Sequence, residues 1–328
     1  MAVIDERGHR MDYQPPFERT ARIDNLCMEI AEMVGSLTPA SELSTSPTLH
    51  RRLRIQTIHS SLLIEGNGLA QDQVVDVLDG KRVLGNARYI LEVKNAQRAY
   101  AMLGELDPLS VDDLLTAHGV MMEGLIRDAG RFRSGDVGVF DGDALIHAGT
   151  PASYVPEVMA GIFSWMHSTD LHPLLVSCVF HYEFEFVHPF SDGNGRTGRL
   201  WQTLMLSRWR APLAWLPVET IIRSRQQGYY AAFGQSNADG ICTAFVEFML
   251  EVIRAALKPY AAGGTDRDAE ELRVLDYFSS NPKGTVAGLA SALGISKRSA
   301  ERLVAALKSD GRLVRKGSPR AGTWEVNP

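Results

Sequence analysis

Cysteine is scarce in this chain of 328 residues, and long apolar runs are absent from it. The three cysteines, Cys27, Cys178 and Cys242, are odd in number, scattered and never spaced as a CxxC pair. Neither a disulfide framework nor a zinc site is therefore expected. No stretch reaches the roughly 18 apolar residues of a membrane span, and the N-terminus has no apolar signal-peptide core. We expect a cytoplasmic protein with no membrane partner.

Charge of one sign is also limited, because the net charge is −5. This value argues against a chain that binds nucleic acid along its whole length. The composition, 45% hydrophobic and 22% charged, is that of an ordinary globular protein. The length allows two or three domains. We predict an N-terminal helical region over 1–105, a catalytic core over 106–262 and, after a linker around Ala261–Thr265, a small domain over 266–328.

Apolar residues recur at helical spacing through most of the chain, which predicts a mainly α fold. The exception is Phe132–His147, where strand-like alternation around the turn Asp141–Asp143 predicts a β-hairpin. The expected helices lie at Ile23–Val34, Leu53–Leu63, Ala87–Leu103, Val111–Met122, Val155–Met166, Pro173–Val187, Gly195–Trp209 and Thr243–Leu257.

The segment HPFSDGNGRTGR, from His188 to Arg199, concentrates more reactive groups than any other part of the sequence. An imidazole titrates near neutral pH, so His188 can accept a proton from a hydroxyl. Asp192 offers carboxylate oxygens, which suit Mg²⁺ shared with phosphate oxygens. The segment therefore predicts a site for a metal-bound polyphosphate with a histidine beside it.

Glycines and arginines in the same segment indicate an anion cradle. Gly193, Asn194 and Gly195 tolerate left-handed backbone angles and can turn their N–H groups inward. The helix that follows adds the positive end of its dipole. Arg196 and Arg199 are neighbours on that helix and can grip phosphate oxygens. A calcium loop would need further acidic ligands that the sequence lacks, and a plain surface turn would leave the arginines and the histidine unexplained.

The segment resembles the signature of the Fic family, HPFxDGNGRxxR, at every specified position. Known Fic proteins mostly transfer AMP from ATP to a Ser, Thr or Tyr hydroxyl of a protein. The resemblance implies a Fic-type helical bundle with His188 as general base and Asp192 as Mg²⁺ ligand. It also implies that Asn194 and the glycine backbone bind the α- and β-phosphates, while Arg196 and Arg199 hold the phosphate tail. The residues alone indicate phosphate transfer with Mg²⁺, and nucleotidyl transfer rests on the resemblance.

The predicted hairpin has a counterpart in the family. Gly130–Arg133 resembles the family segment that leads into a flap over the active site, with Val137 and Val139 as flap residues. A free hairpin edge can bind an extended target segment through backbone hydrogen bonds. An ordinary surface hairpin is the alternative.

The stretch from Tyr229 to Asp239 resembles the family segment that lines the base pocket. The resemblance implies that Tyr230 and Asn237 bind the nucleotide, and the tyrosine pair offers area for stacking on adenine. Packing at a helix end is the alternative.

Ser61–Asn67 resembles the Fic inhibitory motif, [ST]xxxE[GN]. Ser61 and Glu65 lie four apart, on one helix face, and Gly66 can end the helix in a left-handed cap. A glutamate among apolar neighbours needs a positive partner, and the family implies Arg199. Occupying that arginine would leave the γ-phosphate of ATP unheld. The alternative is a solvated glutamate near a helix cap.

The last part of the chain predicts a winged helix-turn-helix domain. Ser296 is a candidate N-cap for the second helix of the pair. From Ile295 onward eight Lys or Arg residues stand against three acidic ones, a net charge of +5. The predicted elements are helices at Asp268–Phe278, Val286–Leu293 and Lys297–Leu307, and strands at Leu313–Arg315 and Thr323–Val326.

Winged-helix domains often place the second helix in the DNA major groove, with phosphate contacts from the wing. Lys297, Arg298, Arg302 and Arg315 would make these contacts. Such domains also serve as protein-docking or dimerisation units, so a protein partner and a homodimer stay open.

Together the sequence favours an autoinhibited protein adenylyltransferase that uses Mg²⁺ and ATP on a protein with an exposed hydroxyl. One alternative is the removal of AMP at the same site. Another is a DNA-binding regulator whose Fic domain senses nucleotide. His172 and His181 lie on or beside an apolar helix, and packing is their expected role.

Overall fold

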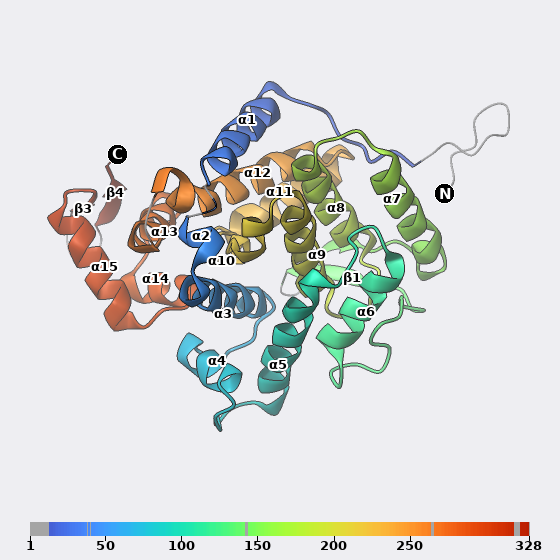
Figure 1. Ribbon diagram of the computed structural model, residues 1–328, viewed down its shortest axis with the longest axis horizontal. Helices are drawn as coiled ribbons and strands as arrows, with labels where there is room; N and C mark the ends of the chain where they lie inside the picture. Colours follow the sequence, from blue (N-terminus) through green and yellow to red (C-terminus); the bar gives the residue numbers. More distant parts are fainter. Residues whose placement is uncertain are drawn as a thin grey trace. The chain divides into compact units, whose positions relative to one another are not determined.

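The computed structural model describes residues 13–37, 39, 41–141, 144–263, 266–317 and 322–327, with side chains except at 138–148 and 262–269. Helices account for most of the described chain, as the periodicity predicted (Figure 1). The described residues pack into two units. Unit 1 draws on Met1–Cys27, Gly85–Ala214 and Gly228–Leu250, and unit 2 on Met28–Leu84, Trp215–Gln227 and Glu251–Pro328.

Unit 1 is built around two adjacent helices, α8 (Pro173–Val187) and α9 (Asn194–Trp209), which lie side by side (Figure 1). Almost every residue of α8 is buried. The two helices approach closely at Gly198, where a Cβ would lie 3.0 Å from the Phe184 ring. Around them lie α5 (Ala87–Ala101), α6 (Val111–Met122) and α7 (Val155–Ser168), together with parts of α1 (Ala21–Ser36), α11 (Gln226–Asp239) and α12 (Thr243–Leu257).

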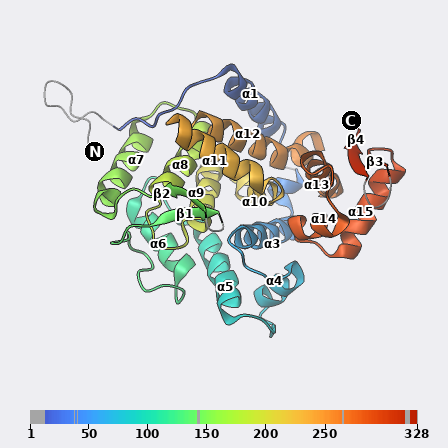
Figure 2. The same cartoon turned by 180° about the vertical axis from the view of Figure 1, so that it is seen from behind.

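The hairpin forms between α6 and α7, where the alternation predicted it. Strands β1 (Gly138–Asp141) and β2 (Ala144–Ala148) pair antiparallel, with an irregularity between Val139 and Phe140 (Figure 2). The strands are shorter than the predicted segment, so Val137 precedes β1. The side chain of Val139 and the turn residues 142–143 lie outside the described part.

Unit 2 contains α3 (Pro47–Ile64), the helix that carries the predicted inhibitory motif. It begins at a Ser46 cap, whose hydroxyl accepts from the Leu49 N–H. It ends as predicted at a left-handed glycine, because Gly66 has φ +84° and donates to the Leu63 carbonyl, while Asn67 donates to Leu62. The unit also holds α2 (Glu42–Thr45), α4 (Gln71–Leu78) and α10 (Val218–Ser224).

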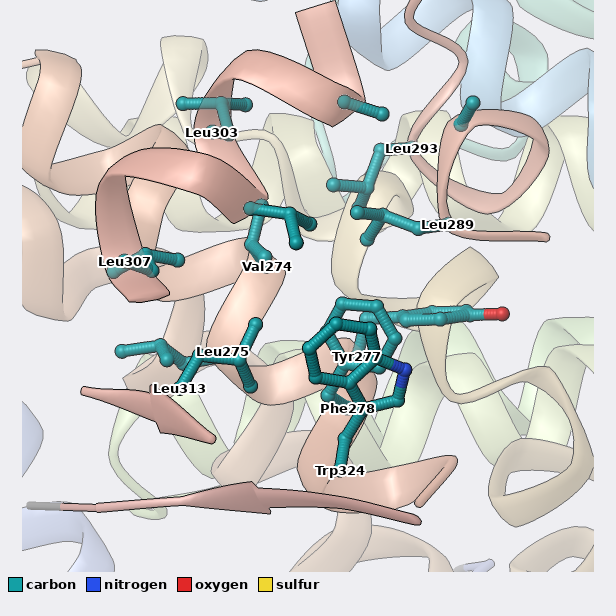
Figure 3. Packing of buried hydrophobic residues seen from close by; sticks show 13 residues of the cluster. Val274, Leu275, Tyr277, Phe278, Leu289, Leu293, Leu303, Leu307, Leu313 and Trp324 are labelled. Carbon is teal, nitrogen blue, oxygen red and sulfur yellow. The ribbon is translucent and has the colours of Figure 1, made fainter. Parts of the chain in front are cut away.

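The rest of unit 2 includes a C-terminal module that comprises α13 (Asp266–Ser280), α14 (Val286–Leu293), α15 (Lys297–Ser309) and the antiparallel strands β3 (Leu313–Lys316) and β4 (Thr323–Val326). The Ser296 hydroxyl caps α15 by accepting from the Ser299 N–H, as predicted. The module has its own apolar core, in which Val274, Phe278 and Trp324 meet leucines of both later helices (Figure 3). Residues 318–321 of the predicted wing lie outside the described part.

Among the described helices, four α-helices had no counterpart in the predicted set, namely α2, α4, α10 and α11. The first three are short, and α11 has almost no apolar periodicity, since its buried residues are Tyr229, Phe233 and Ser236. Within the described ranges, no helix is both long and apolar enough to span a membrane.

Candidate active site

His188 closes helix α8 in an unusual backbone conformation. It has φ +52°, which makes it the one residue other than glycine with positive φ in the described chain. Its N–H donates to the Phe184 carbonyl at 2.9 Å. Left-handed backbone costs a non-glycine residue about 1–2 kcal/mol, so the surrounding contacts must impose it. The sharp turn sends the chain directly into Pro189 and the loop that follows.

Arg133 supplies those contacts. Its side chain is almost wholly buried. Nε donates to the His188 carbonyl at 2.7 Å, and Nη2 donates to the Val187 carbonyl at 3.2 Å. The same guanidinium also donates to the carbonyls of Gly135 and Thr150, on either side of the hairpin. One buried cation therefore fixes both the backbone of His188, the predicted general base, and the two ends of the hairpin.

The Asp192 carboxylate lies between two arginines. Arg88 Nη2 on α5 donates to Oδ2 at 2.9 Å, and Arg196 Nη2 donates to Oδ1 at 2.7 Å. Arg196 also pairs with Glu92 at 3.4 Å, deep enough that its guanidinium is only 4% exposed. The structure therefore ties Arg196 to carboxylates that orient the loop, while its Nε has no hydrogen-bond partner among the described residues.

The predicted anion cradle is a sharp turn at Gly193, whose N–H donates to Asp192 Oδ1 at 2.6 Å. Gly193 has φ +86°, and a Cβ there would lie 2.5 Å from the Met122 sulfur, so only glycine fits. Asn194 spans the loop instead of projecting from it: its Oδ1 accepts from the Phe190 N–H at 2.9 Å and its Nδ2 donates to the Phe190 carbonyl at 2.8 Å. Gly193 is the N-cap of α9, so the positive end of this helix lies at the cradle.

His118 on α6 packs against the loop between α8 and α9. Its ring stacks on Phe190 with centroids 3.6 Å apart. Nδ1 accepts from the Gly130 N–H at 3.0 Å, so Nε2 carries the proton and donates to the Asp192 carbonyl, also at 3.0 Å. Burial lowers the pKa of His118 to about 4. The ring is therefore neutral at physiological pH and acts as a fixed hydrogen-bonding spacer.

Arg199 and the predicted base-pocket residues also lie in unit 1. Arg199 is buried on α9, one turn beyond Arg196. Tyr230 and Asn237 lie on α11, where Asn237 Oδ1 accepts from the Tyr182 hydroxyl at 2.9 Å. Asn237 Nδ2 has no hydrogen-bond partner in the described chain. The neighbouring Tyr229 packs in the core, with its hydroxyl 3.1 Å from His181 Nε2.

The predicted inhibitory residues belong to unit 2. Ser61 is buried on α3, whereas Glu65 is the exposed C-cap residue of that helix and Gly66 follows it. The predicted DNA contacts belong to the same unit. Lys297, Arg298 and Arg302 are exposed on α15, whereas Arg315 stacks on Trp324 at 4.8 Å.

The donor set at the loop fits one hard cation shared with phosphate. No cluster of three or more His, Cys, Asp or Glu side chains that could hold a metal occurs in the part of the chain that the structure describes. Mg²⁺ is commonly held by only one or two carboxylates, with substrate phosphates completing the shell. Asp192 is 37% exposed. Its Oδ1 accepts from Arg196 and from the Gly193 N–H, whereas Oδ2 accepts from Arg88 alone and keeps a lone pair for a cation.

Four residues that position this site were missed by the sequence analysis, namely Arg88, Glu92, His118 and Arg133. All but Arg133 lie far along the chain from any motif, and Arg133 was considered only as part of the segment before the hairpin. A buried arginine among carbonyls gives no local signal in a sequence, because its partners come from α8 and from both ends of the hairpin.

A helical bundle that presents a histidine, an aspartate and a glycine-rich helix N-terminus in one loop defines a class of phosphate-handling domain. The model of the Fic/DOC family matches residues 108–206. A crystal structure of a Fic family protein from Desulfovibrio desulfuricans G20 is 43% identical, covers 96% of this chain and 98% of that one, and superposes with a TM-score of 0.74. The chain therefore belongs to the Fic family.

More distant relatives carry names that describe an activity. The protein adenylyltransferase fic-1 of Caenorhabditis elegans is 30% identical over 237 residues, which are 67% of this chain and 44% of that protein. The protein adenylyltransferase Fic of Nematostella vectensis is 28% identical over 222 residues, 64% of this chain and 49% of that protein. The chain thus spans about half the length of these curated relatives. A structure of Fic-1 from C. elegans matches with 25% identity and a TM-score of 0.57, over 73% of this chain and 70% of that one.

Proposed function

We propose that this chain is an autoinhibited protein adenylyltransferase, which transfers AMP from ATP to a hydroxyl of a target protein. The observation that carries the proposal is the short loop between α8 and α9. It brings together His188, the Asp192 carboxylate and the N-terminus of α9. The names of the curated relatives favour AMP over other transferred groups.

In this proposal His188 removes the proton from the target hydroxyl as the oxygen attacks the α-phosphorus of ATP. The bond from that phosphorus to the bridging oxygen breaks, pyrophosphate leaves, and the imidazole keeps the proton. The N–H groups of Asn194 and Gly195, at the start of α9, hold the α- and β-phosphates. The N–H of Gly193, predicted to join them, instead donates to Asp192 Oδ1 at 2.6 Å and shapes the turn. Arg199 holds the phosphate tail, and Arg196 orients the aspartate, since its bonds go to Asp192 and Glu92.

Asp192 is the residue that would hold Mg²⁺, which neutralises phosphate charge when bound. The two arginines that contact its oxygens keep the carboxylate facing one way. Tyr230 and Asn237 are the proposed contacts of the adenine ring. The Nδ2 group of Asn237 can donate to an acceptor nitrogen on that ring. Val137 and Val139 belong to the proposed flap, whose edge would align the target segment.

The proposed brake is Glu65. Its carboxylate would pair with Arg199 and so remove the group that holds the γ-phosphate. The α-phosphate would then lie out of line for attack. Support comes from the local structure of the motif, since Ser61 is buried and Gly66 fixes the end of α3 directly after the glutamate.

For the C-terminal module we propose a winged-helix domain that binds DNA phosphates through Lys297, Arg298 and Arg302. These side chains are exposed on one helix in the net basic part of the chain. The stacking of Arg315 on Trp324 makes it a weaker candidate. A protein partner or a second copy of the chain is the alternative occupant, and a deletion of the module that leaves DNA affinity unchanged would exclude the DNA contact.

The test uses ATP labelled at the α- or the γ-phosphate, with Mg²⁺ and three proteins: wild type, Glu65→Gly, and Glu65→Gly/His188→Ala. We expect protein labelled from the α-position only, most strongly in Glu65→Gly and absent without His188. Label from the γ-position would instead indicate phosphoryl transfer. Loss of AMP from a pre-labelled target, abolished by Glu65→Gly, would indicate that removal of AMP dominates.

A further inference from the structure

A cavity of about 330 Å³ lies within unit 1, where the flap meets helices α7 and α8. Its walls are mostly apolar, with Pro151, Tyr154 and Val158 on one side and Phe186 and Val187 of α8 on the other. This size falls at the lower end of small-molecule sites, which typically measure about 300–1,000 Å³. No role assigned so far uses the side chains of these residues.

One carboxyl group lies among these apolar walls. Glu183 on α8 lines the cavity and is 4% exposed. Its Oε2 accepts a hydrogen bond from the Tyr13 hydroxyl, which also lines the cavity. Its Oε1 is buried and has no hydrogen-bond partner among the described residues. A buried acceptor without a donor costs about 1–3 kcal/mol, so a ligand that brings a donor to Oε1 recovers that energy.

The cavity is joined to the active site through Arg133. This guanidinium donates to the carbonyls of Thr150 and Val187, which both line the cavity, and to the carbonyl of His188. Thr150 follows strand β2 almost directly. With the target segment on the proposed flap and its hydroxyl at His188, a neighbouring side chain of the target would lie within reach of the cavity.

We propose that this cavity is a specificity pocket for a lysine side chain of the target protein, close in sequence to the hydroxyl that accepts AMP. The inference rests on the proposed function. The aliphatic stem of lysine would pack on the apolar walls, and its ammonium would donate to Glu183 Oε1. Arginine fits less well, because its planar fork favours both oxygens of a carboxylate and Tyr13 already occupies one. An acidic side chain would be repelled.

The first experiment measures AMP transfer at pH 8, where Glu183 is ionised, by Glu65→Gly to short peptides that carry one threonine and one lysine at varied spacing. Matched peptides carry norleucine, which has the stem without the charge. We expect the best lysine peptide to exceed its norleucine partner by about tenfold in kcat/KM, equivalent to one hydrogen bond to a charged group. Adding Glu183→Gln should remove the preference, whereas Glu157→Gln, at an exposed position of α7, should keep it.

Tyr13→Phe provides a second variant, because it opens the other oxygen of Glu183. Arginine peptides should then improve relative to lysine peptides. Equal rates for lysine and norleucine peptides in the Glu65→Gly protein would overturn the proposal. A change in KM for ATP that matches the change in KM for the peptide in Glu183→Gln would also overturn it, since the cavity would then serve the nucleotide.

Binding without catalysis separates this proposal from the proposed function. The probes are N-acetyl-lysine methylamide and its norleucine analogue, detected by saturation-transfer NMR on the full chain. The lysine probe should bind wild type more strongly, and Glu183→Gln should abolish the difference. If no peptide or protein accepts AMP, the proposed function fails and the NMR difference alone decides on the pocket. Equal binding of the two probes to wild type overturns the pocket, whatever the transfer assay gives.

Discussion

Arg273 Nη1 donates a 2.8 Å hydrogen bond to Gln56 Oε1, and both side chains are buried within unit 2. Arg273 lies on α13, the first helix of the C-terminal module, while Gln56 lies on α3, the helix that Glu65 caps. The C-terminal module therefore holds the helix that carries the proposed brake. A change in the module can therefore reach Glu65 through α3, because the module contacts this helix at Gln56 and Glu65 lies at its C-terminal end.

We predict that Arg273→Ala weakens both stability and the brake. The substitution leaves the Gln56 oxygen buried without this donor, at a cost of about 1–3 kcal/mol. Self-labelling from α-labelled ATP should rise a few-fold in an otherwise wild-type chain. Arg312→Ala is the control, because Arg312 pairs with Glu271 at 2.8 Å, a contact within the C-terminal module itself. Equal labelling by both variants would show that the module does not act on α3.

A second link between the C-terminal module and α3 is the contact of Gly294 with His59. Gly294 lies at the turn between α14 and α15 with φ +62°, and a Cβ there would lie 2.2 Å from His59 Nδ1. Gly311 has φ +70° but nothing within 4 Å of its Cβ position. Gly311→Ala should therefore cost only the left-handed backbone strain of about 1–2 kcal/mol. Gly294→Ala should cost about 1–3 kcal/mol more from overpacking.

Chemical denaturation of both variants measures these costs. The double variant His59→Ala/Gly294→Ala should recover part of the extra loss, because the ring that clashes is gone, and a double-mutant cycle isolates that coupling. Equal losses for Gly294→Ala and Gly311→Ala would mean that the His59 ring moves aside without cost.

The fold could be predicted from the sequence wherever an apolar stripe or a cap marks an element. Helix α8 matches its predicted bounds, because Pro173 marks its start and Pro189 prevents its continuation. Helix α11 was missed because its polar and aromatic residues follow no stripe. Its helical state depends on packing within unit 1, which no local pattern records. The strands of the hairpin were placed with the right pairing but begin later than the alternation suggested.

The candidate site could be predicted where its chemistry is contiguous in sequence, from His188 to Arg199. The groups that hold this loop could not, since Arg88, His118 and Arg133 come from other helices and loops and contact mostly backbone carbonyls. The motif predicts Asn194 and Arg196 as phosphate ligands alone. Their hydrogen bonds to Phe190 and Asp192 show that they also shape the loop.

Burial of Glu183 predicts a pH-dependent stability. Desolvation raises the pKa of this carboxyl from 4.5 to about 7 despite the Tyr13 hydrogen bond, which lowers it. The unfolded chain releases the proton near its ordinary pKa and the folded chain does not, so stability falls as pH rises from about 4.5 to 7. The full loss of unfolding free energy is about 3 kcal/mol, because a pKa difference of one between the folded and unfolded chain corresponds to about 1.36 kcal/mol.

Glu183→Gln removes the titrating group. Its unfolding free energy should therefore exceed that of wild type at pH 8 and approach the wild-type value at pH 4. Urea unfolding at several pH values, followed by circular dichroism, measures the difference. A constant difference between the two proteins across this range would show that Glu183 does not titrate on folding.

Arg133→Lys tests the positioning of the proposed base. Arg133 donates to four carbonyls, including those of His188 and Thr150, whereas lysine has three donors and no planar fork. We expect kcat for AMP transfer, measured in the Glu65→Gly background, to fall by about 10²-fold, the scale of a misplacement near 1 Å. KM for ATP should change little, because the cradle is held by other residues.

Arg131→Lys, at an exposed position two residues earlier, should leave kcat unchanged. A proportional rise in KM for ATP would instead indicate that Arg133 supports the nucleotide site, and a wild-type kcat would show that the His188 turn forms without it.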